Sequence, residues 1–314
     1  MGTMSYHSPV LLAECLDFLH LRPDGTYVDA TFGGGGHSRA ILERLGPQGR
    51  LIAFDQDPDA QANALDDPRF TLVPHNFEHL KRFLKLHGAP QVDGILADLG
   101  VSSHQLDRPE RGFAHKYDGP LDMRMDTTRG MPASAWLATA TQDNLERVIR
   151  DYGEERFAIQ IAKAIIASRQ QGTTIGTTRQ LAQIVARVVR TREFEQDPAT
   201  RTFQAIRIYI NQELTDLEGG LRAAFHCLKP GGLLAVISFH SLEDRIVKQF
   251  MQGLSKVSVP RGLPLTEKQM PKPLAELLGR IKPSEKEVKE NPRARSAILR
   301  VMRKIKSVPE GAIS

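Results

Sequence analysis

The sequence predicts an α/β fold in which a doubly wound, mostly parallel sheet is interrupted by an inserted α-helical subdomain. Three observations support this prediction. Short β-branched or apolar runs alternate with helical patterns over the first hundred residues, helical periodicity alone continues to about residue 210, and strand signals then return. The sheet domain is therefore expected to be discontinuous, formed by residues 1–105 and 211–314, with the helical subdomain at 106–210.

The first part of the sheet domain is expected to contain four strands, at 26–31, 50–55, 70–74 and 92–98. Helical stretches begin between them, near His37, Asp57 and Phe77. The second stretch opens with Asp57-Pro58, an N-cap residue followed by a proline in the first turn. Strands that are joined through helices in this way pair in parallel.

The remainder of the chain is predicted from the same periodicities. Helices are expected in the insertion at 136–140, 143–152, 154–169, 178–189 and 199–210. The sheet domain then resumes with a helix at 212–228, a turn at Pro230-Gly231-Gly232, a strand at 233–239 and a helix at 241–254. From Val259 onward, frequent prolines indicate extended loops before a last strand at 296–304.

The composition is that of a globular protein, with 40% hydrophobic and 25% charged residues in a chain of 314. No apolar run approaches the roughly 20 residues that a membrane-spanning helix needs, and the first thirty residues lack the apolar core of a signal peptide. We therefore expect a cytoplasmic protein with no membrane partner. Cys15 and Cys227 fall inside helical patterns, so we interpret both as core residues and expect no metal site.

The net charge of +5 is distributed unevenly. Residues 1–99 carry an excess of acids, whereas residues 254–306 contain fourteen Lys and Arg against five Asp and Glu. Such a basic region favours a polyanionic partner, although a solvated tail without a partner has the same composition. Arg293, Arg295 and Arg300 are interpreted as phosphate contacts, with the alternative that they brace the last strand against acids of the sheet.

A glycine-rich segment, Val28-Asp29-Ala30-Thr31-Phe32-Gly33-Gly34-Gly35-Gly36-His37, lies where the first strand passes into the first helix. Glycines allow a sharp turn with positive φ and a close approach of the backbone to a ligand. A dinucleotide motif starting at Gly33 or Gly34 would need glycine in place of Ser38 or Arg39. The acid-x-x-x-Gly-x-Gly pattern of class I methyltransferases, in contrast, fits Asp29, Gly33 and Gly35, although an ordinary loose turn remains an alternative.

Three further residues are candidates for a nucleoside site. Asp55 ends the second strand, where a carboxylate can accept hydrogen bonds from both ribose hydroxyls; the alternative role, helix capping, is better served by Asp57. Phe77 could pack on the adenine face or in the core. Asp98 ends the fourth strand, at the carboxyl edge where open α/β sheets bind ligands.

Longer segments resemble the bacterial 16S rRNA cytosine-N4 methyltransferase family. They are Asp29-Ala-Thr-Phe-Gly-Gly-Gly-Gly-His37, Asp98-Leu-Gly-Val-Ser-Ser103, Arg111-Gly-Phe113, Asp118-Gly-Pro-Leu-Asp-Met-Arg-Met-Asp126, Tyr152-Gly-Glu-Glu-Arg156, Thr200-Arg-Thr-Phe-Gln-Ala205, Ser238-Phe-His-Ser-Leu-Glu-Asp-Arg245 and Asn291-Pro-Arg-Ala-Arg-Ser296. The resemblance implies a class I (Rossmann-like) methyltransferase that uses S-adenosyl-L-methionine. It also implies cofactor contacts at Gly35, Gly36, His37, Asp55, Phe77, Asp98 and Gln105.

The substrate that this resemblance implies is a cytidine in the decoding region of 16S rRNA, within the small ribosomal subunit. The exocyclic amine of cytosine is a poor nucleophile, because its lone pair is delocalised into the ring. An enzyme must therefore position the amine and accept hydrogen bonds from its protons. Asp98 is one candidate for this role, while Phe113 or Phe239 could stack on the base or belong to the core.

His240 is a second catalytic candidate, because helix capping accounts for Ser241, Glu243 and Asp244 but leaves His240 unexplained. Four arginines near the start of the insertion could contact phosphates or pair with acids; these are Arg108, Arg111, Arg124 and Arg129. Two other classes of function stay open, a nicotinamide-dependent oxidoreductase and a non-catalytic RNA-binding assembly factor. A homodimer is compatible with the sequence, which does not determine the oligomeric state.

Overall fold

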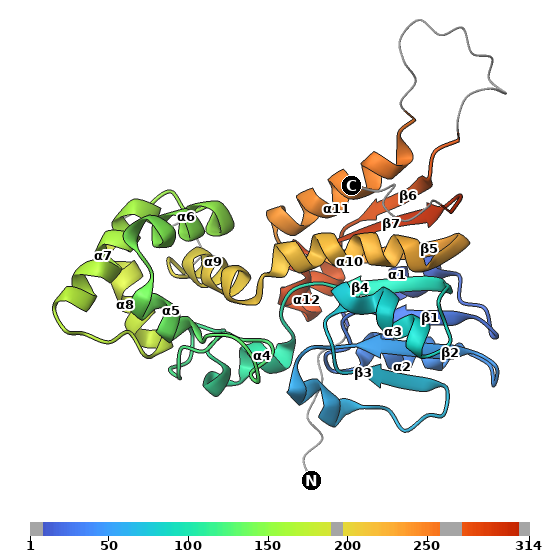
Figure 1. The fold of residues 1–314 in the computed structure, drawn as a ribbon, viewed down its shortest axis with the longest axis horizontal. Coiled ribbons are helices and arrows are strands. Elements are labelled where there is room, and N and C mark those ends of the chain that lie inside the picture. Colours follow the sequence, from blue (N-terminus) through green and yellow to red (C-terminus); the bar gives the residue numbers. More distant parts are fainter. Residues whose placement is uncertain (1–8, 190–196, 258–271, 308–314) are drawn as a thin grey trace, which may run out of the picture. The chain divides into compact units, whose positions relative to one another are not determined.

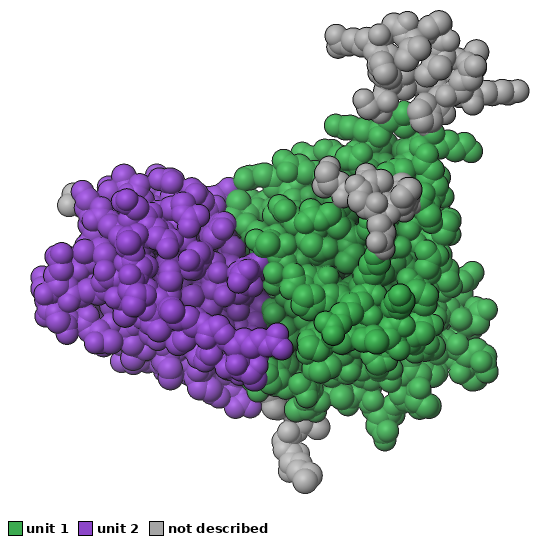
Figure 2. Space-filling model, viewed as in Figure 1, with its two compact units in different colours: residues 1–100, 214–314 green, residues 101–213 purple. Residues whose placement is uncertain are grey.

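The computed structural model describes residues 9–189, 197–257 and 272–307. The chain divides into two compact units: unit 1 contains Met1–Gly100 and Leu214–Ser314, and unit 2 contains Val101–Glu213 (Figure 2). The boundaries between the units thus lie near the residues at which strand signals stop and resume in the sequence. Among the described residues, no helix is both long and apolar enough to cross a membrane.

Unit 1 is built on one seven-stranded sheet with the strand order β3-β2-β1-β4-β5-β7-β6 (Figure 1). The first five strands of the chain pair in parallel; they are β1 Thr26–Asp29, β2 Arg50–Phe54, β3 Phe70–Val73, β4 Val92–Asp98 and β5 Leu228–Ser238. The last two, β6 Ala275–Ile281 and β7 Ile298–Lys304, are antiparallel to their neighbours. The order reverses between β1 and β4, which is the switch point where sheets of this class bind ligands.

Helices cover both faces of this sheet (Figure 1). One face packs against α3 Leu80–Leu86, α10 Glu213–Cys227 and α11 Ser241–Ser255, and the other against α1 Leu12–Leu19 and α2 Gly36–Leu42. Alternate strand residues serve the two cores: Val28 lies in the first, whereas its neighbour Tyr27 lies in the second. Burial on both faces explains why the strands read as nearly continuous apolar runs. Cys15 and Cys227 are buried in these cores, as predicted.

Unit 2 is helical and has its own hydrophobic core. Its elements are α4 Ser103–Asp107, η3 Pro109–Arg111, α5 Ala133–Thr139, α6 Gln142–Gly153, α7 Ala158–Gln170, α8 Thr178–Val188 and α9 Thr200–Asn211. Helices α6 and α9 approach closely at Gly153, where a Cβ atom would lie 2.7 Å from the carbonyl oxygen of Arg201. The two sequence segments around Gly153 and Arg201 therefore form a helix–helix contact in the core of this unit.

The predicted strands and most predicted helices are present, and three expectations need correction. The helical stretch after Asp57 is a short 3-10 segment, η1 Pro58–Asn63. Strand β5 begins at Leu228 rather than at residue 233, because the predicted Pro-Gly-Gly turn is accommodated as an irregularity in its pairing with β4. Strand β6 and helix α12 Glu285–Glu290 were expected to be loop, and the prolines of this region flank them instead of interrupting them.

Two of the C-terminal basic residues have structural roles, so the basic region is less available to a polyanionic partner than the charge count indicates. Lys304 is 1% exposed, and its ammonium group donates hydrogen bonds to the carbonyl oxygens of Phe225, near the end of α10, and Leu228, at the start of β5. Arg300 makes a two-pronged contact with Asp244, with N–O distances of 2.7 and 3.0 Å. Arg300 therefore braces the last strand, although its partner is an acid of helix α11 and not of the sheet.

Replacing Arg300 with Ala is expected to lower the free energy of unfolding by about 2 kcal/mol, because Asp244 would remain partly buried without its partner. Burial alone raises the pKa of Asp244, but Arg300 outweighs it and holds the pKa below its ordinary value. The matched control is Arg303→Ala, which removes an exposed pair with Glu276 and should cost less than about 0.5 kcal/mol. Urea denaturation measures the free energy of unfolding of both variants. Equal decreases in the two variants would contradict the bracing role of Arg300.

Candidate active site

The glycine-rich turn connects β1 to α2 at the switch point of the sheet. Gly33 and Gly35 have φ angles of +52° and +74°, in the left-handed region that favours glycine. A Cβ atom at Gly35 would lie 2.8 Å from ring atoms of Phe32, so the turn has no room for a side chain there. The glycines at these two positions are thus required by the conformation of the loop itself.

The carboxylate of Asp29, the last residue of β1, holds this turn in place through hydrogen bonds. Its side chain is 1% exposed and accepts hydrogen bonds from the amide of Thr31 and the hydroxyl of Ser38, the latter at 2.7 Å. Burial raises the pKa of Asp29, and these two donors oppose the shift. Both oxygens are engaged within the protein, so Asp29 shapes the turn.

Asp55 follows β2 and is fastened to the same turn. One carboxylate oxygen accepts a hydrogen bond from the amide of Gly33 at 2.7 Å, and the other accepts one from the amide of Asp57 at 2.8 Å. Asp57 itself caps η1, as predicted. Each carboxylate oxygen can accept more than one hydrogen bond, so Asp55 retains capacity for two hydroxyl donors. Its contact with Gly33, however, was not anticipated from the sequence.

Asp98 ends β4 and carries the clearest sign of a missing partner. Its Oδ1 atom is buried and has no hydrogen-bond partner among the described residues. Its Oδ2 atom lies 3.7 Å from Nδ1 of His37, and the Nε2 atom of His37 lies 3.1 Å from the carbonyl oxygen of Val10. A buried carboxylate oxygen without a donor is costly, so a ligand that supplies a donor or a positive charge fits this position.

Phe77 and Gln105 are two further residues for which cofactor contacts were expected, and both contact neighbouring residues of the protein. Phe77 is half-buried, and its ring lies against Gly220 of α10, where a Cβ atom would overlap it. The ring is thus partly covered by the protein. Gln105 belongs to unit 2, where its side chain accepts a hydrogen bond from the amide of Ser102 in a capping box of α4. Contacts of these two residues with a cofactor stay predictions.

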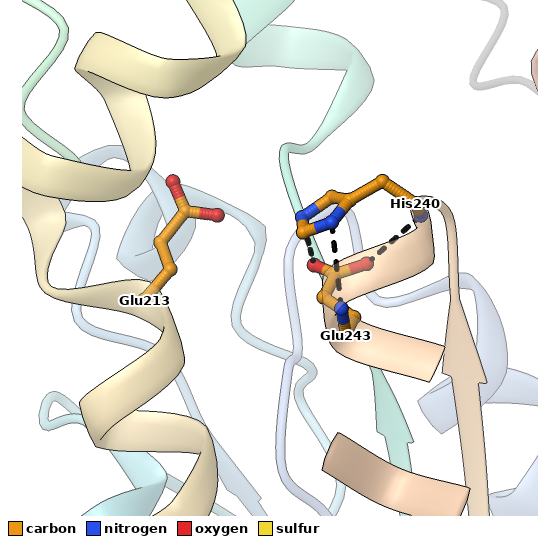
Figure 3. A group of neighbouring side chains, drawn as sticks. All are labelled: Glu213, His240 and Glu243. Carbon is orange, nitrogen blue, oxygen red and sulfur yellow. Dashed lines mark hydrogen bonds and ion pairs between the residues drawn. The ribbon is translucent and has the colours of Figure 1, made fainter. Parts of the chain in front are cut away.

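His240 caps a helix, a role that was expected for the residues that follow it. It is the N-cap of α11: its Nδ1 atom accepts a hydrogen bond from the amide of Glu243, and its own amide donates to the Glu243 carboxylate (Figure 3). Its Nε2 atom lies 3.2 Å from Oε1 of Glu243, which is buried. The expectation that capping leaves His240 unexplained was therefore wrong. Its buried Nε2 atom has no hydrogen-bond partner among the described residues, and contact with a substrate stays a prediction.

A model of the MraW methylase family matches residues 4–305 of this chain. The chain belongs to this family. Among curated relatives, "Ribosomal RNA small subunit methyltransferase H" of Ralstonia pickettii (strain 12J) is 58% identical over 305 residues, covering 94% of this chain and 96% of the relative. The protein of the same name from Janthinobacterium sp. (strain Marseille) is also 58% identical, covering 95% of this chain and 94% of the relative.

Membership of the MraW methylase family supports S-adenosylmethionine as the cofactor and gives no support to a nicotinamide-dependent oxidoreductase. The residues at the switch point fit such a ligand. Asp55 can accept hydrogen bonds from ribose hydroxyls, and Asp98 has an unsatisfied buried oxygen at which positive charge is favourable. Gly33 is half-buried, and its positive φ turns the backbone at this edge of the sheet.

The arginines near the start of unit 2 are largely engaged with acids or carbonyl groups of the same MraW methylase chain. Arg124 pairs with Asp122 at 2.8 Å, and Arg129 pairs with Asp126 at 3.5 Å. Arg111 is buried and donates to two backbone carbonyls, while Arg108 pairs with Glu110. Of the two alternatives left open by the sequence, acid pairing is thus observed for Arg108, Arg124 and Arg129.

Two contacts that hold strand ends at this MraW methylase site were not predicted from the sequence, which assigned Glu243 to helix capping only. Thr31 accepts a hydrogen bond from the amide of Asp98 through its hydroxyl oxygen, and so links the glycine turn to the end of β4. Glu243 accepts one from the amide of Phe239 at 2.8 Å, and so fixes the end of β5. Neither carries a sequence signal of its own, because a threonine at a strand end and an acid in the first turn of a helix are both common.

Cofactor binding is expected to depend on pH around 6. Burial raises the pKa of both Asp55 and Asp98 to about 6, although backbone amides oppose the shift at Asp55 and His37 opposes it at Asp98. Hydroxyl donors and a positive charge favour ionised carboxylates. Lowering the pH through this range should therefore weaken binding, by up to about tenfold per pH unit for each carboxyl group that must lose its proton.

Calorimetry in buffers of different ionisation enthalpy measures the protons exchanged on binding. We expect proton release near pH 6 that disappears by about pH 8. An affinity for S-adenosylmethionine that stays constant across this range would show that neither carboxylate faces the ligand.

Proposed function

We propose that this chain transfers a methyl group from S-adenosylmethionine to the exocyclic N4 of a cytidine in the decoding region of 16S rRNA, within the small ribosomal subunit. The observation that carries the proposal is the unsatisfied buried oxygen of Asp98 at the switch point, beside the glycine turn and in a chain of the MraW methylase family. The names of the curated relatives support rRNA of the small subunit as substrate. An enzyme that acts there is expected in the cytoplasm.

In this proposal, some residues of unit 1 bind the cofactor and another positions the target amine. Asp55 and the turn at Gly33 and Gly35 bind and orient the cofactor, which supplies an electrophilic methyl group when bound. Asp98 lies at the carboxyl edge of the neighbouring strand and can accept a hydrogen bond from the target amine. Holding the amine in line with the methyl group converts the reaction into an effectively intramolecular one, and this positioning accounts for much of the rate.

The cysteines favour a nitrogen over a carbon of the base as the methyl acceptor. Methylation at a cytosine carbon requires a thiolate nucleophile beside the base. The chain has two cysteines. Burial raises the pKa of Cys15 well above its ordinary value and that of Cys227 to about 11, so neither thiol is activated. Direct transfer to the amine needs no such nucleophile.

The experiment that tests this function offers the protein a choice of acceptors. Purified protein with methyl-labelled S-adenosylmethionine is incubated with small ribosomal subunits, naked 16S rRNA and DNA, and incorporated label is counted. Label in the rRNA of one or both ribosomal acceptors supports the proposal. A protein that binds subunits but transfers no label would be a non-catalytic assembly factor. Label in DNA alone would also overturn the proposal.

A further inference from the structure

A surface loop of unit 2, residues 114–119, is held firmly by the helices beneath it. The hydroxyl of Thr178, in the first turn of α8, donates a hydrogen bond to the carbonyl oxygen of Tyr117 at 2.7 Å and accepts one from the amide of Gly119. The amide of Thr178 donates to the carbonyl oxygen of Gly119 at 3.0 Å. A Cβ atom at Gly119 would overlap the carbonyl group of Pro109, so the loop also lies close to η3.

The same loop is fastened to a second helix through His115. The Nε2 atom of His115 lies 3.3 Å from the hydroxyl oxygen of Thr200, the first residue of α9, and its Nδ1 atom lies 3.6 Å from the Asp197 carboxylate. Its ring packs edge-on against Phe203, with ring centroids 5.5 Å apart. The loop is thus anchored on both sides of its tip.

This anchored loop presents an aromatic side chain to solvent. Tyr117 is 42% exposed, and it is the only aromatic residue among the large hydrophobic side chains that are exposed in the described parts of the chain. The Lys116 ammonium group lies 5.4 Å from the centroid of the Tyr117 ring. Because the loop is anchored, little conformational entropy would be lost when a ligand covers the ring.

We propose that Tyr117 and Lys116 form a platform on which an unpaired base of the rRNA stacks, with Lys116 near the neighbouring phosphate. The proposal rests on the proposed function, which supplies RNA as the partner. A nucleobase fits an exposed ring with an adjacent cation, because bases stack on aromatic rings and the phosphate of the same nucleotide attracts a lysine. Phe113 is less suited to this role, since it is 5% exposed.

The test compares Tyr117→Ala with Tyr117→Phe, which keeps the ring, and with Met131→Ala, which removes another exposed apolar side chain of unit 2. Affinity for a fluorescently labelled single-stranded fragment of 16S rRNA is measured by anisotropy, and KM and kcat with small subunits by label transfer. Tyr117→Ala should weaken rRNA binding and raise KM on the order of tenfold, with kcat little changed. The other two variants should stay within about twofold of the parent. Cofactor affinity should be unchanged in all three.

Three results would overturn the platform. The first is unchanged rRNA affinity and KM in Tyr117→Ala. The second is an equal loss in Tyr117→Phe, which would assign the contact to the hydroxyl. The third is weaker binding to intact subunits but not to the rRNA fragment, which would make a ribosomal protein the partner. Failure of the parent protein to methylate any RNA would instead overturn the proposed function, and the anisotropy comparison distinguishes that case because it needs no catalysis.

Discussion

Replacing Gly35 with Val is expected to reduce the affinity for S-adenosylmethionine by at least about 100-fold, the largest effect of any single change at the site. For a β-branched residue, adopting the positive φ of this position costs about 1–2 kcal/mol. Its Cβ atom would also meet the Phe32 ring at 2.8 Å. The turn must therefore shift, and with it the amide of Gly33 that binds Asp55. The sequence predicts that the backbone of this turn approaches the ligand closely, and the structure adds displacement of the loop by the new side chain.

Gly88→Val provides the matched control. Gly88 has a φ of +69°, close to that of Gly35, and a Cβ atom there would have no neighbour within 4 Å. This variant should lose a similar amount of stability through its backbone conformation but retain cofactor binding. Calorimetry and thermal melting of both proteins make the comparison. Normal affinity in a folded Gly35→Val protein would exclude the glycine turn from the cofactor site.

Replacing Asp55 with Ala is expected to weaken cofactor binding on the order of 100-fold, because hydrogen bonds from two ribose hydroxyls to a charged acceptor are lost together. The structure also predicts a stability cost. The amides of Gly33 and Asp57 would lose their acceptor, which should lower the free energy of unfolding by about 1–3 kcal/mol. Binding must therefore be measured at a temperature at which the variant remains folded.

Asp67→Ala is the matched control for this change. The Asp67 carboxylate also accepts a hydrogen bond from a backbone amide, that of Arg69, but it precedes β3 and so lies at the opposite edge of the sheet from the site. The Asp67→Ala substitution should therefore leave the affinity for the cofactor unchanged. An Asp55→Ala protein with normal affinity would limit Asp55 to its structural role of holding the turn.

The fold could be predicted in outline because its strongest signals are local. Buried parallel strands give nearly continuous apolar runs, and the helices of unit 2 have clear periodicity. Strand β6 escaped prediction because only its first residue, Ala275, is fully buried, so its sequence shows no apolar run. It forms at the sheet edge because β7 pairs with it, and such long-range pairing leaves little trace in the sequence.

In the candidate site, too, features that follow from a local sequence pattern could be predicted, whereas specific side-chain contacts could not. The glycine turn and the strand-end acids follow from local pattern and from the rule that parallel strands align their carboxyl ends. The contact of Asp55 with Gly33, the capping role of His240 and the pairing of Arg300 with Asp244 join residues whose relationship depends on side-chain geometry. From the sequence, His240 became a catalytic candidate because capping was assigned to the residues that follow it. Its Nδ1 atom, however, accepts the same hydrogen bond as a serine hydroxyl.

The chemical identity of the product tests the central claim most directly. Small-subunit rRNA methylated by the protein is digested to nucleosides, and the labelled nucleoside is identified by chromatography and mass spectrometry. We expect N4-methylcytidine at a single position in the decoding region, and no label with Asp98→Ala at equal protein concentration. Label in 5-methylcytidine, in a purine or in the ribose would contradict direct transfer to the cytosine amine at this site.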